Sequence, residues 1–373
     1  MHTVAYEYVP LSFLFSSGLL RLLIKSAPYM GLVDRPDERK VHEGAIPVVG
    51  GLAVSATLLV MLTIAYGSTY WDLLAGTTIL TLLGVVDDRR GLKATTKLLV
   101  QALLVSALFG AGQMQISNLG DLFGTGHRIE LELLALPFTV FAVVGVINAV
   151  NMIDGADGLA GGVVFISIAW FLVASMLASG QVSVALFGTM LAAIAGFLAF
   201  NMRSPWRRRA ACFLGDAGSL ALGFALAWIA VELTQEQSAR RIPAVVALWV
   251  VGLPIMDTLS LMLRRLAKGR SPVSADRDHL HHILLRAGYS HGQMVAILLL
   301  ISAIFGAVGV IGHYAGLSDA TLFYSYLALA FAYHQAMMHA WRLAVLLRRN
   351  AQPAENPPAA SQPVHAENPV RER

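Results

Sequence analysis

Two adjacent carboxylates, Asp87 and Asp88, end an otherwise apolar stretch of this 373-residue chain. Because like charges repel, we expect one of the two to keep its proton or a cation to lie between them. The alternative is a solvated helix end, but the carboxyl end of a helix favours basic residues over a carboxylate pair. The pair therefore predicts a charged functional site at the end of a helix.

A second polar segment, residues 148–162, combines acids, amides and glycines. In a helical turn Asp154 and Asp157 would share one face, and Asn151 would extend that face backwards. The neighbouring glycines would let the backbone approach a ligand closely. Oxygen ligands of this kind suit a hard cation such as Mg²⁺, whereas the ligand spacing of an EF-hand is absent. A glycine-rich turn with solvated acids is the alternative.

The third and fourth segments add one more acid and a basic, histidine-rich loop. Asp216 lies in segment 213–219 at the start of an apolar run, where an aspartate is also a common helix cap. The loop 264–291 holds several arginines and the sequence His279-Leu280-His281-His282. Zinc is one interpretation, but basic surroundings without a nearby cysteine favour a phosphate or diphosphate held by arginine and histidine. Contact with lipid headgroups is the other interpretation of this loop.

The composition excludes a soluble protein. Hydrophobic residues make up 56% of the chain and charged residues 13%, about half the usual share of a soluble domain. The single cysteine excludes an intramolecular disulfide framework. We predict an all-α polytopic membrane protein, because about eleven apolar runs are long enough to cross a bilayer as helices. These runs are 9–28, 47–67, 70–86, 96–112, 133–152, 158–179, 182–200, 212–231, 243–263, 293–313 and 319–345.

The Lys and Arg residues predict how these spans are oriented. When the loops are assigned alternately to two sides, 24 of the 27 basic residues fall on one side, counting Arg21 and Lys25 of the first run with it. The positive-inside rule makes that side cytoplasmic, with the N-terminus outside and the C-terminus inside. All four polar segments then face the cytoplasm. The net charge of +4 thus orients the chain and predicts no nucleic-acid partner.

Residues 1–349 are predicted to form one membrane domain. Residues 350–373 are rich in Pro, Ala, Glu and Gln, which predicts a disordered cytoplasmic tail. On the outer side, the polar and glycine-containing stretch near 113–132 predicts a short β-hairpin.

Carboxylates for a divalent cation and a basic loop on one membrane face suit phosphoryl transfer from a soluble donor to an acceptor in the membrane. A secondary transporter is the competing class, but its polar residues would line a path at the midplane, usually with internal repeats, and no sequence repeat is found. A CDP-alcohol phosphotransferase shares part of an Asp-Gly motif with residues 154–158, but the rest of that motif is absent.

Five motifs in order, over about residues 30–290, resemble the polyprenyl-phosphate N-acetylhexosamine-1-phosphate transferases, most of all the bacterial undecaprenyl-phosphate GlcNAc-1-phosphate transferase branch. The motifs are Asp34-Arg35-Pro36 with 47–51, the pair Asp87-Asp88, 148–162, 213–219 and 271–282. The resemblance implies transfer of GlcNAc-1-phosphate from UDP-GlcNAc to undecaprenyl phosphate with release of UMP, and a requirement for Mg²⁺ or Mn²⁺. It implies a multi-pass enzyme of the bacterial inner membrane, surrounded by membrane lipids, that starts a cell-surface polysaccharide such as O-antigen.

The resemblance also implies roles for individual residues. The metal ligands would be Asn151 and Asp216. The catalytic groups would be four acids and one histidine: Asp87, Asp88, Asp154, Asp157 and His282. The substrate-binding groups would be Lys97, Asn201, Phe213, Arg265, His279 and His281.

Within this set, the pair Asp87-Asp88 would lie near the lipid phosphate, one of them acting as a base or orienting the attack. Lys97 would face the lipid phosphate or the donor diphosphate. The pair Asp154 and Asp157 would contact the nucleotide sugar or an outer water of the metal.

The remaining residues would hold the donor. Phe213 would lie against the uracil with Asn201 nearby, and the arginine and histidines of the fourth loop would hold the diphosphate and sugar.

One feature of the fourth loop favours the aminosugar branch. The sister branch, the phospho-MurNAc-pentapeptide transferases, carries three consecutive histidines, whereas Leu280 interrupts the run here. UDP-MurNAc-pentapeptide and other UDP-N-acetylated sugars remain open as donors, as does a homodimer.

Overall fold

The structure is a computed structural model, and it describes residues 5–34, 44–111, 114–178, 184–204, 206–207, 209–235, 242–271, 279–339, 342 and 344–345. The predicted disordered tail, 350–373, lies outside the described residues. So do Arg35 and Pro36 of the first motif and most of the segment that precedes His279 in the fourth loop.

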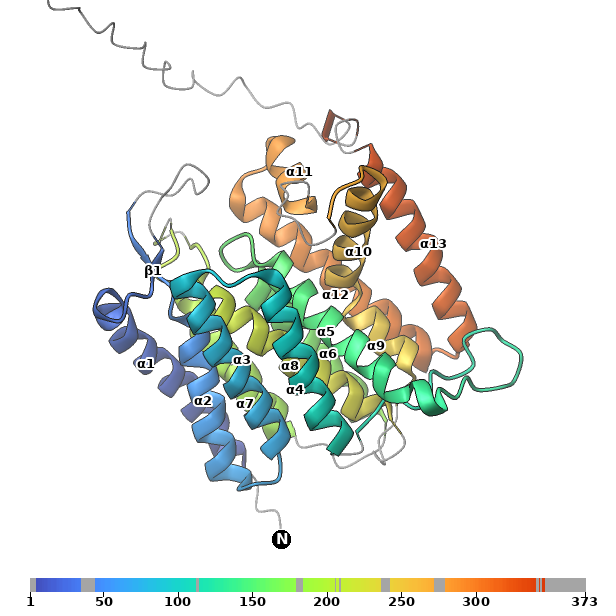
Figure 1. Cartoon of the computed structure of the whole chain (residues 1–373), viewed down its shortest axis with the longest axis horizontal. Coiled ribbons are helices and arrows are strands. Elements are labelled where there is room, and N and C mark those ends of the chain that lie inside the picture. The colour runs from blue at the N-terminus through green and yellow to red at the C-terminus, as the bar shows by residue number, and fades with distance from the viewer. Residues whose placement is uncertain are drawn as a thin grey trace, which may run out of the picture.

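The described chain is almost entirely helical (Figure 1). The helices are α1 Tyr8–Met30, α2 Gly50–Tyr66, α3 Trp71–Arg90, α4 Ala94–Ala111, α5 Ala135–Ile153, α6 Leu159–Leu177, α7 Val184–Asn201, α8 Gly215–Thr234, α9 Ala244–Val250, α10 Gly252–Ala267, α11 Leu280–Arg286, α12 His291–Tyr314 and α13 Asp319–Met338. Two short 3₁₀ turns, Ala5–Glu7 and Glu132–Leu134, precede α1 and α5. The only named strands in the described residues, β1 Val33–Asp34 and β2 Ile46–Pro47, pair antiparallel.

The predicted all-α polytopic membrane protein is confirmed. Among the described residues, seven helices are long and apolar enough to cross a membrane, or eight if a bent pair is counted as one span. That pair is α9 and α10, which meet at an angle of 76° where the sequence predicts one continuous span over 243–263. Each of the other ten predicted runs contains one helix. Eleven crossings, and the orientation of the termini, remain predictions.

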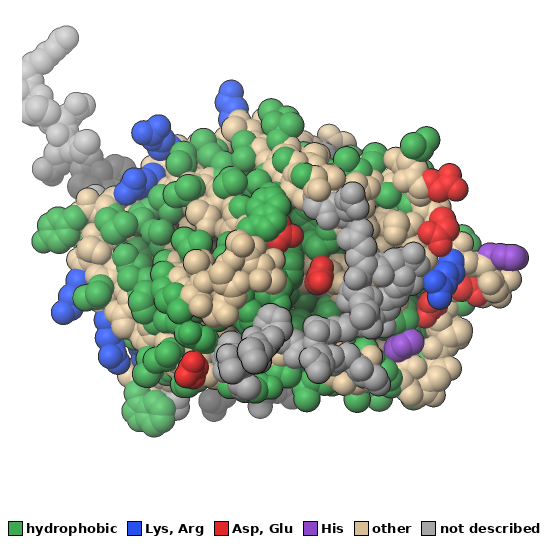
Figure 2. Space-filling model, turned by 90° about the horizontal axis from the view of Figure 1, so that it is seen from below, with side chains coloured by type: hydrophobic (Ala, Val, Ile, Leu, Met, Phe, Trp, Pro, Cys, Tyr) green, Lys and Arg blue, Asp and Glu red, His purple; other side chains and the backbone are tan. Residues whose placement is uncertain are grey.

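The outer surface of the bundle is apolar, as a lipid-facing surface must be. Large hydrophobic side chains stay exposed on several helices, among them Leu22, Leu103, Phe141, Leu300 and Phe331. Figure 2 shows the molecule from below the view of Figure 1, and on this face hydrophobic side chains are widespread while the Lys and Arg side chains lie toward the outline. In water such a surface would drive aggregation, whereas hydrocarbon solvates it.

The central helix is α8, which packs against α2, α3, α5 and α6. Its first turn is approached closely because glycines face it: a Cβ on Gly51 of α2 would lie 2.1 Å from the backbone nitrogen of Gly218. Likewise, a Cβ on Gly84 of α3 would lie 2.2 Å from the backbone nitrogen of Ala217. These contacts bring the carboxyl end of α3 beside the amino end of α8.

The predicted hairpin near 113–132 has antiparallel backbone pairing but little regular strand. Backbone hydrogen bonds join Leu119 N to Ile129 O at 3.0 Å and Leu131 N to Ser117 O at 2.8 Å, around one bridge between Asn118 and Glu130. This loop is therefore a hairpin with a single bridge.

Candidate active site

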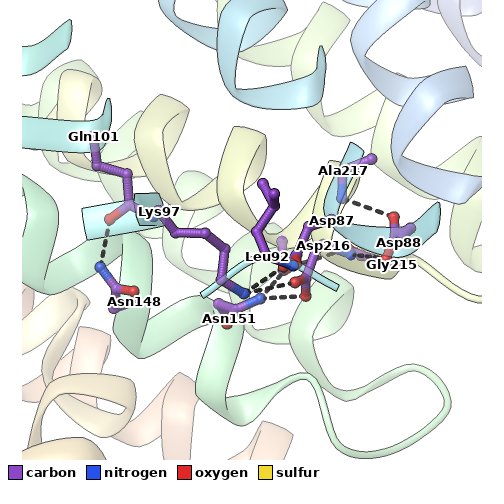
Figure 3. Close-up of polar contacts among 11 residues, drawn as sticks. Asp87, Asp88, Leu92, Lys97, Gln101, Asn148, Asn151, Gly215, Asp216 and Ala217 are labelled. Atoms are coloured by element: carbon purple, nitrogen blue, oxygen red, sulfur yellow. Dashed lines mark hydrogen bonds and ion pairs between the residues drawn. The ribbon is translucent and has the colours of Figure 1, made fainter. Parts of the chain in front are cut away.

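Four helix ends bring polar side chains to one point (Figure 3). Lys97, in the first turn of α4, bonds through Nζ to Asp87 Oδ2 at the end of α3 and lies 2.9 Å from Asp216 Oδ2 at the start of α8. From the last turn of α5, Asn151 Nδ2 donates to Asp216 Oδ1 at 2.7 Å and to Ser219 Oγ at 2.8 Å. The structure thus brings together residues of three separate sequence motifs. We call Asp87, Lys97, Asn151 and Asp216 the carboxylate cluster.

Asp88 lies beside this cluster but points elsewhere. Its Oδ1 accepts a hydrogen bond from the backbone nitrogen of Asp216 at 3.0 Å, and its Oδ2 accepts one from Ala217 N at 3.2 Å. The first backbone N–H groups of a helix lack intrahelical partners, and a carboxylate there is favoured by the helix dipole. Asp88 therefore caps α8 from a neighbouring helix and holds the backbone that carries Asp216.

The turn before Asp216 requires glycine. Gly215 has φ of +74°, and a Cβ there would lie 2.3 Å from Val48 Cγ1 and 2.7 Å from Asp88 Oδ2. Glycine therefore precedes Asp216 because Asp88 and Val48 pack too closely against residue 215 to leave room for a side chain.

The two acids of the carboxylate cluster differ in accessibility. Asp87 is 7% exposed, and its Oδ1 also accepts a hydrogen bond from Leu92 N at 2.5 Å. The side chain of Asp216 is 30% exposed, and that of Lys97 is 18% exposed. Asp216 and Lys97 are therefore the charged groups that a substrate or an ion can reach.

The cluster fits a divalent cation that keeps several ligands from water or substrate. No three His, Cys, Asp or Glu side chains in the described ranges are placed to enclose a metal. Asp216 nevertheless offers a partly exposed carboxylate, and Asn151 Oδ1 accepts no hydrogen bond from any described residue. One carboxylate and one amide oxygen beside a phosphate site are the kind of set that Mg²⁺ uses.

The loop between α5 and α6 holds the other two predicted acids, and it is not helical. α5 ends at Ile153 and Gly158 has φ of +83°, so Asp154 and Asp157 do not share a helix face. Burial raises the pKa of the Asp154 carboxyl well above its usual range, and the charges of Asp216, Asp88 and Asp157 raise it further. We therefore expect Asp154 to be protonated.

Asp157 is held from the segment after α7. Its Oδ2 accepts a hydrogen bond from Arg203 Nε at 2.7 Å and lies 3.9 Å from His291 Nε2. This ion pair anchors the loop at a point away from the carboxylate cluster.

Asn201 and Phe213 join the loops that surround the site. Asn201 is 5% exposed; its Oδ1 accepts from Gly158 N at 2.6 Å and its Nδ2 donates to Cys212 O at 2.9 Å. Phe213 N donates to Pro47 O at 2.8 Å, which ties this segment to β2. Both side-chain polar atoms of Asn201 are thus used inside the protein.

The three histidines of the fourth loop form a stacked group at the start of α11. The rings of His279 and His281 are 5.4 Å apart and tilted by 14°, and those of His281 and His282 are 4.1 Å apart. Burial, helped by the two neighbouring histidines, lowers the pKa of His281 to about 3, so that its ring is neutral. A Cβ on Gly155 would lie 2.5 Å from His281 Nε2, so the histidines contact the loop that carries Asp154.

One buried acid near this loop was missed by the sequence analysis. Asp257, in α10, is 3% exposed, and its Oδ2 lies 2.8 Å from His279 Nδ1. Arg265, predicted to bind substrate, lies two turns further along the same helix and is 3% exposed. An ionisable residue inside an apolar run is itself a signal of function, and that criterion would have identified Asp257 within the predicted span 243–263.

Comparison with known proteins gives one family match and several relatives that align over nearly the whole chain. Residues 70–234, from the start of α3 to the end of α8, match the family model "Glycosyl transferase family 4". The chain is 35% identical to the undecaprenyl-phosphate α-N-acetylglucosaminyl 1-phosphate transferase of Escherichia coli K12, over 93% of this chain and 94% of that protein. It is 37% identical to the same-named protein of Yersinia pestis (90% and 92%) and 33% identical to that of Haemophilus influenzae (90% and 95%).

The family match covers the carboxylate cluster, and the relatives extend over the fourth loop and the last helices as well. The chain therefore belongs to glycosyl transferase family 4, as a sugar-1-phosphate transferase of the polyprenyl-phosphate N-acetylhexosamine-1-phosphate transferase family.

Proposed function

We propose that this enzyme transfers GlcNAc-1-phosphate from UDP-GlcNAc to undecaprenyl phosphate, giving undecaprenyl-diphospho-GlcNAc and UMP. Relatives named for this activity match nearly the whole chain at 33–37% identity. The observation that carries the proposal is the carboxylate cluster, in which an accessible acid and an accessible ammonium lie 2.9 Å apart at the end of apolar helices. Such a site can bind both a cation and a phosphate.

Asn151 and Asp216 would hold the divalent metal, Mg²⁺ or Mn²⁺, on which such enzymes generally depend. When bound, the ion would offset negative charge on the donor diphosphate. Asp88 supports this assignment indirectly, because it fixes the first turn of α8 and thereby the carboxylate of Asp216.

Lys97 is the group proposed to receive the lipid phosphate. Its ammonium is a compact charge on a flexible stem, and one of its two carboxylate partners, Asp216, is partly exposed. A phosphate oxygen can replace Asp216 as a partner of Lys97 while Asp87 keeps the amine in place. Asp87 then orients the lysine, and the lipid phosphate, already anionic, needs no strong base.

We favour a direct transfer. An oxygen of the lipid phosphate forms a bond to the β-phosphorus of UDP-GlcNAc, and the bond from that phosphorus to the bridging oxygen breaks, so that UMP leaves. The rival is a covalent intermediate on an aspartate. Both oxygens of Asp87 are already hydrogen-bonded and Asp88 is bound to backbone nitrogens, which leaves neither free to attack.

The fourth loop and the α5–α6 loop are proposed to bind the donor. Arg265 would supply positive charge to the diphosphate, and His282 would donate to it. His281 is neutral, so it would contribute a hydrogen bond and no charge. A protonated Asp154 could likewise donate to a phosphate or sugar oxygen.

The residues around Asp157 would hold the α5–α6 loop in place without contacting the donor themselves. Asp157, held by Arg203, fixes the α5–α6 loop, and Asn201 joins that loop to the segment before Phe213. The ring of Phe213 is proposed to lie against the uracil.

The proposed site lies on the cytoplasmic face of a bacterial inner membrane, where it would start a cell-surface polysaccharide. The four polar segments share the side on which Lys and Arg concentrate. A secondary transporter is disfavoured because its acids would line a path through the membrane centre, whereas the carboxylate cluster lies at helix ends.

The test uses the purified full-length chain with UDP-GlcNAc, Mg²⁺ and undecaprenyl phosphate, scoring both UMP and the lipid product. We expect UMP only when the lipid and the metal are both present. Parallel reactions with UDP-GalNAc and UDP-MurNAc-pentapeptide assign the donor, and a faster reaction with either would overturn the choice of GlcNAc. A phospho-sugar trapped on the protein without lipid would overturn direct transfer.

A further inference from the structure

The last described helix, α13, contains no residue that the sequence motifs assign to the site, yet polar contacts attach it along α9 and α10. They join Leu322 O to Trp249 Nε1 at 3.0 Å, Tyr326 to Gly252 O at 3.1 Å, Tyr333 to Asp257 Oδ1 at 2.5 Å, His334 to Ser260 at 3.2 Å and Met337 O to Arg264 at 3.4 Å. Of these contacts, the one made by Tyr333 reaches a side chain, that of Asp257, which in turn bonds a predicted site residue, His279.

Asp257 is the centre of this connection. Its Oδ2 lies 2.8 Å from His279 Nδ1, and its Oδ1 accepts a hydrogen bond from the Tyr333 hydroxyl at 2.5 Å. The backbone nitrogen of Leu280 approaches the same Oδ1 at 3.4 Å. An ionised carboxylate can only accept hydrogen bonds, so the proton of His279 must be on Nδ1. Both the tautomer and the ring orientation of His279 are then determined by Asp257.

From His279 the contacts continue into the donor site. Its ring stacks on His281, and His281 lies against Gly155 in the loop that carries Asp154. Figure 1 shows α10 between α11 and α13 at this end of the molecule. A continuous set of contacts therefore runs from α13 through α10 and α11 to the loop after α5.

We propose that Tyr333 and Asp257 are positioning residues for the histidines that bind the nucleotide sugar. Asp257 orients His279, and the Tyr333 hydroxyl orients Asp257. The inference rests on the proposed function for the identity of the donor, but the hydrogen bonds themselves do not. Neither residue touches the reacting phosphates; both act through the position of the histidine group.

The first test is Tyr333→Phe, which removes the hydroxyl and keeps the ring. Its matched control is Tyr326→Phe, because Tyr326 is on the same helix and its hydroxyl also donates to α10, at Gly252 O, away from the histidines. For Tyr333→Phe we expect the KM for UDP-GlcNAc to rise about 5- to 10-fold, the size of one ordinary hydrogen bond, because the hydroxyl acts on the donor only through Asp257 and His279. The KM for undecaprenyl phosphate stays within about twofold of wild type, as both KM values do for Tyr326→Phe.

Equal losses in the two variants, or equal rises in the KM for both substrates, would overturn the proposal, because a general loosening of α13 explains either result. Asp257→Asn should have a larger effect, roughly 10- to 100-fold in kcat/KM for the donor, as for other residues that orient a functional histidine.

A double-mutant cycle tests the order of the contacts. If Tyr333 acts only through Asp257 and His279, Tyr333→Phe should have almost no further effect on the donor KM once His279→Ala is present. Multiplication of the two single effects would show that Tyr333 acts independently of His279 and would overturn the assignment.

A measurement that needs no activity separates this proposal from the proposed function. In detergent-solubilised protein labelled with ¹⁵N-histidine, we expect one histidine with a proton on Nδ1 in a strong hydrogen bond, and we expect that signal to be lost in Asp257→Asn and weakened in Tyr333→Phe. Its persistence in Asp257→Asn would refute the connection, whatever donor the enzyme uses. An intact connection in a protein inactive with UDP-GlcNAc would refute the proposed function alone.

Discussion

Replacing Asp88 with asparagine is expected to damage the enzyme through α8 and not through direct loss of a catalytic group. Both oxygens of Asp88 accept hydrogen bonds from backbone nitrogens, those of Asp216 and Ala217, at 3.0 and 3.2 Å. Asparagine keeps one oxygen at the same place but turns an amide NH₂ toward the other backbone N–H. The substitution therefore removes one hydrogen bond, removes the negative charge at the amino end of a helix, and changes little else in volume.

The size of the effect follows from these two losses. A hydrogen bond to a charged group contributes about 1.5 to 3 kcal/mol, and a carboxylate at a helix amino end about 0.3 to 1 kcal/mol. Asparagine is easier to bury than a carboxylate, which offsets part of the loss. We therefore expect a fall of about 2 kcal/mol in the free energy of unfolding, and a few degrees in Tm. Because Asp216 moves with the first turn of α8, the apparent Mg²⁺ affinity should fall by roughly 10-fold or more.

The assay combines UMP release over a Mg²⁺ titration with thermal denaturation in detergent, and the matched control is Asp72→Asn. Asp72 is at the opposite end of α3 and also joins α3 to α8, through a 2.9 Å hydrogen bond from Trp228 Nε1. The control should lower Tm by a similar amount and leave the Mg²⁺ dependence unchanged. If Asp88→Asn retains the wild-type Tm and Mg²⁺ dependence but abolishes turnover, Asp88 contacts the reacting phosphate and the capping explanation is wrong.

Three further predictions concern the metal, the lysine and acid stability. Asn151→Ala should nearly abolish turnover in a protein that still folds, although losing the hydrogen bonds to Asp216 and Ser219 should lower Tm by a few degrees. Wild-type metal dependence in this variant would remove Asn151 as a ligand. Lys97→Met should raise the KM for undecaprenyl phosphate far more than that for UDP-GlcNAc; an unchanged lipid KM would contradict its role. The pKa of His281 is about 3 in the folded protein, against 6.5 ordinarily, so the unfolded chain binds the extra proton below pH 6.5 and stability falls as the pH falls. At pH 5 the loss is about 2 kcal/mol relative to pH 7.5, and thermal denaturation of His281→Gln should show a smaller difference between the two pH values.

The sequence predicts the helices well because a membrane constrains them strongly. A run of about 20 apolar residues has few structures available in hydrocarbon other than a helix, so run length and composition suffice. The bend between α9 and α10 was missed because apolar residues continue on both sides of the break at Val251, so that the run over 243–263 looks like one span. Gly252 and Pro254 lie at this break, and they are the local signal for it.

Which residues lie close together in the carboxylate cluster was easier to predict than the contacts that each of them makes. The motifs and the limits of the apolar runs predict Asp87, Asn151 and Asp216 near helix ends, and the family resemblance adds Lys97; in the structure the four helix ends meet. Their contacts depend on which helices pack together, and that is decided by glycines whose partners are more than a hundred residues away, as with Gly84 and the first turn of α8. The spacing of the motifs therefore could not show that Asp87 bonds Lys97 whereas Asp88, the next residue, caps α8.

The charge balance of the carboxylate cluster connects these observations to the reaction. Lys97 lies between Asp87 and Asp216 and neutralises part of their charge. A divalent cation on Asp216 would compete with this lysine, and an incoming lipid phosphate would attract it. Binding of either one would therefore favour binding of the other, since the lysine freed from Asp216 is the group proposed to meet the phosphate. We expect this coupling to depend on Asp87, which keeps Lys97 in place during the exchange and is buried where neither ligand can displace it.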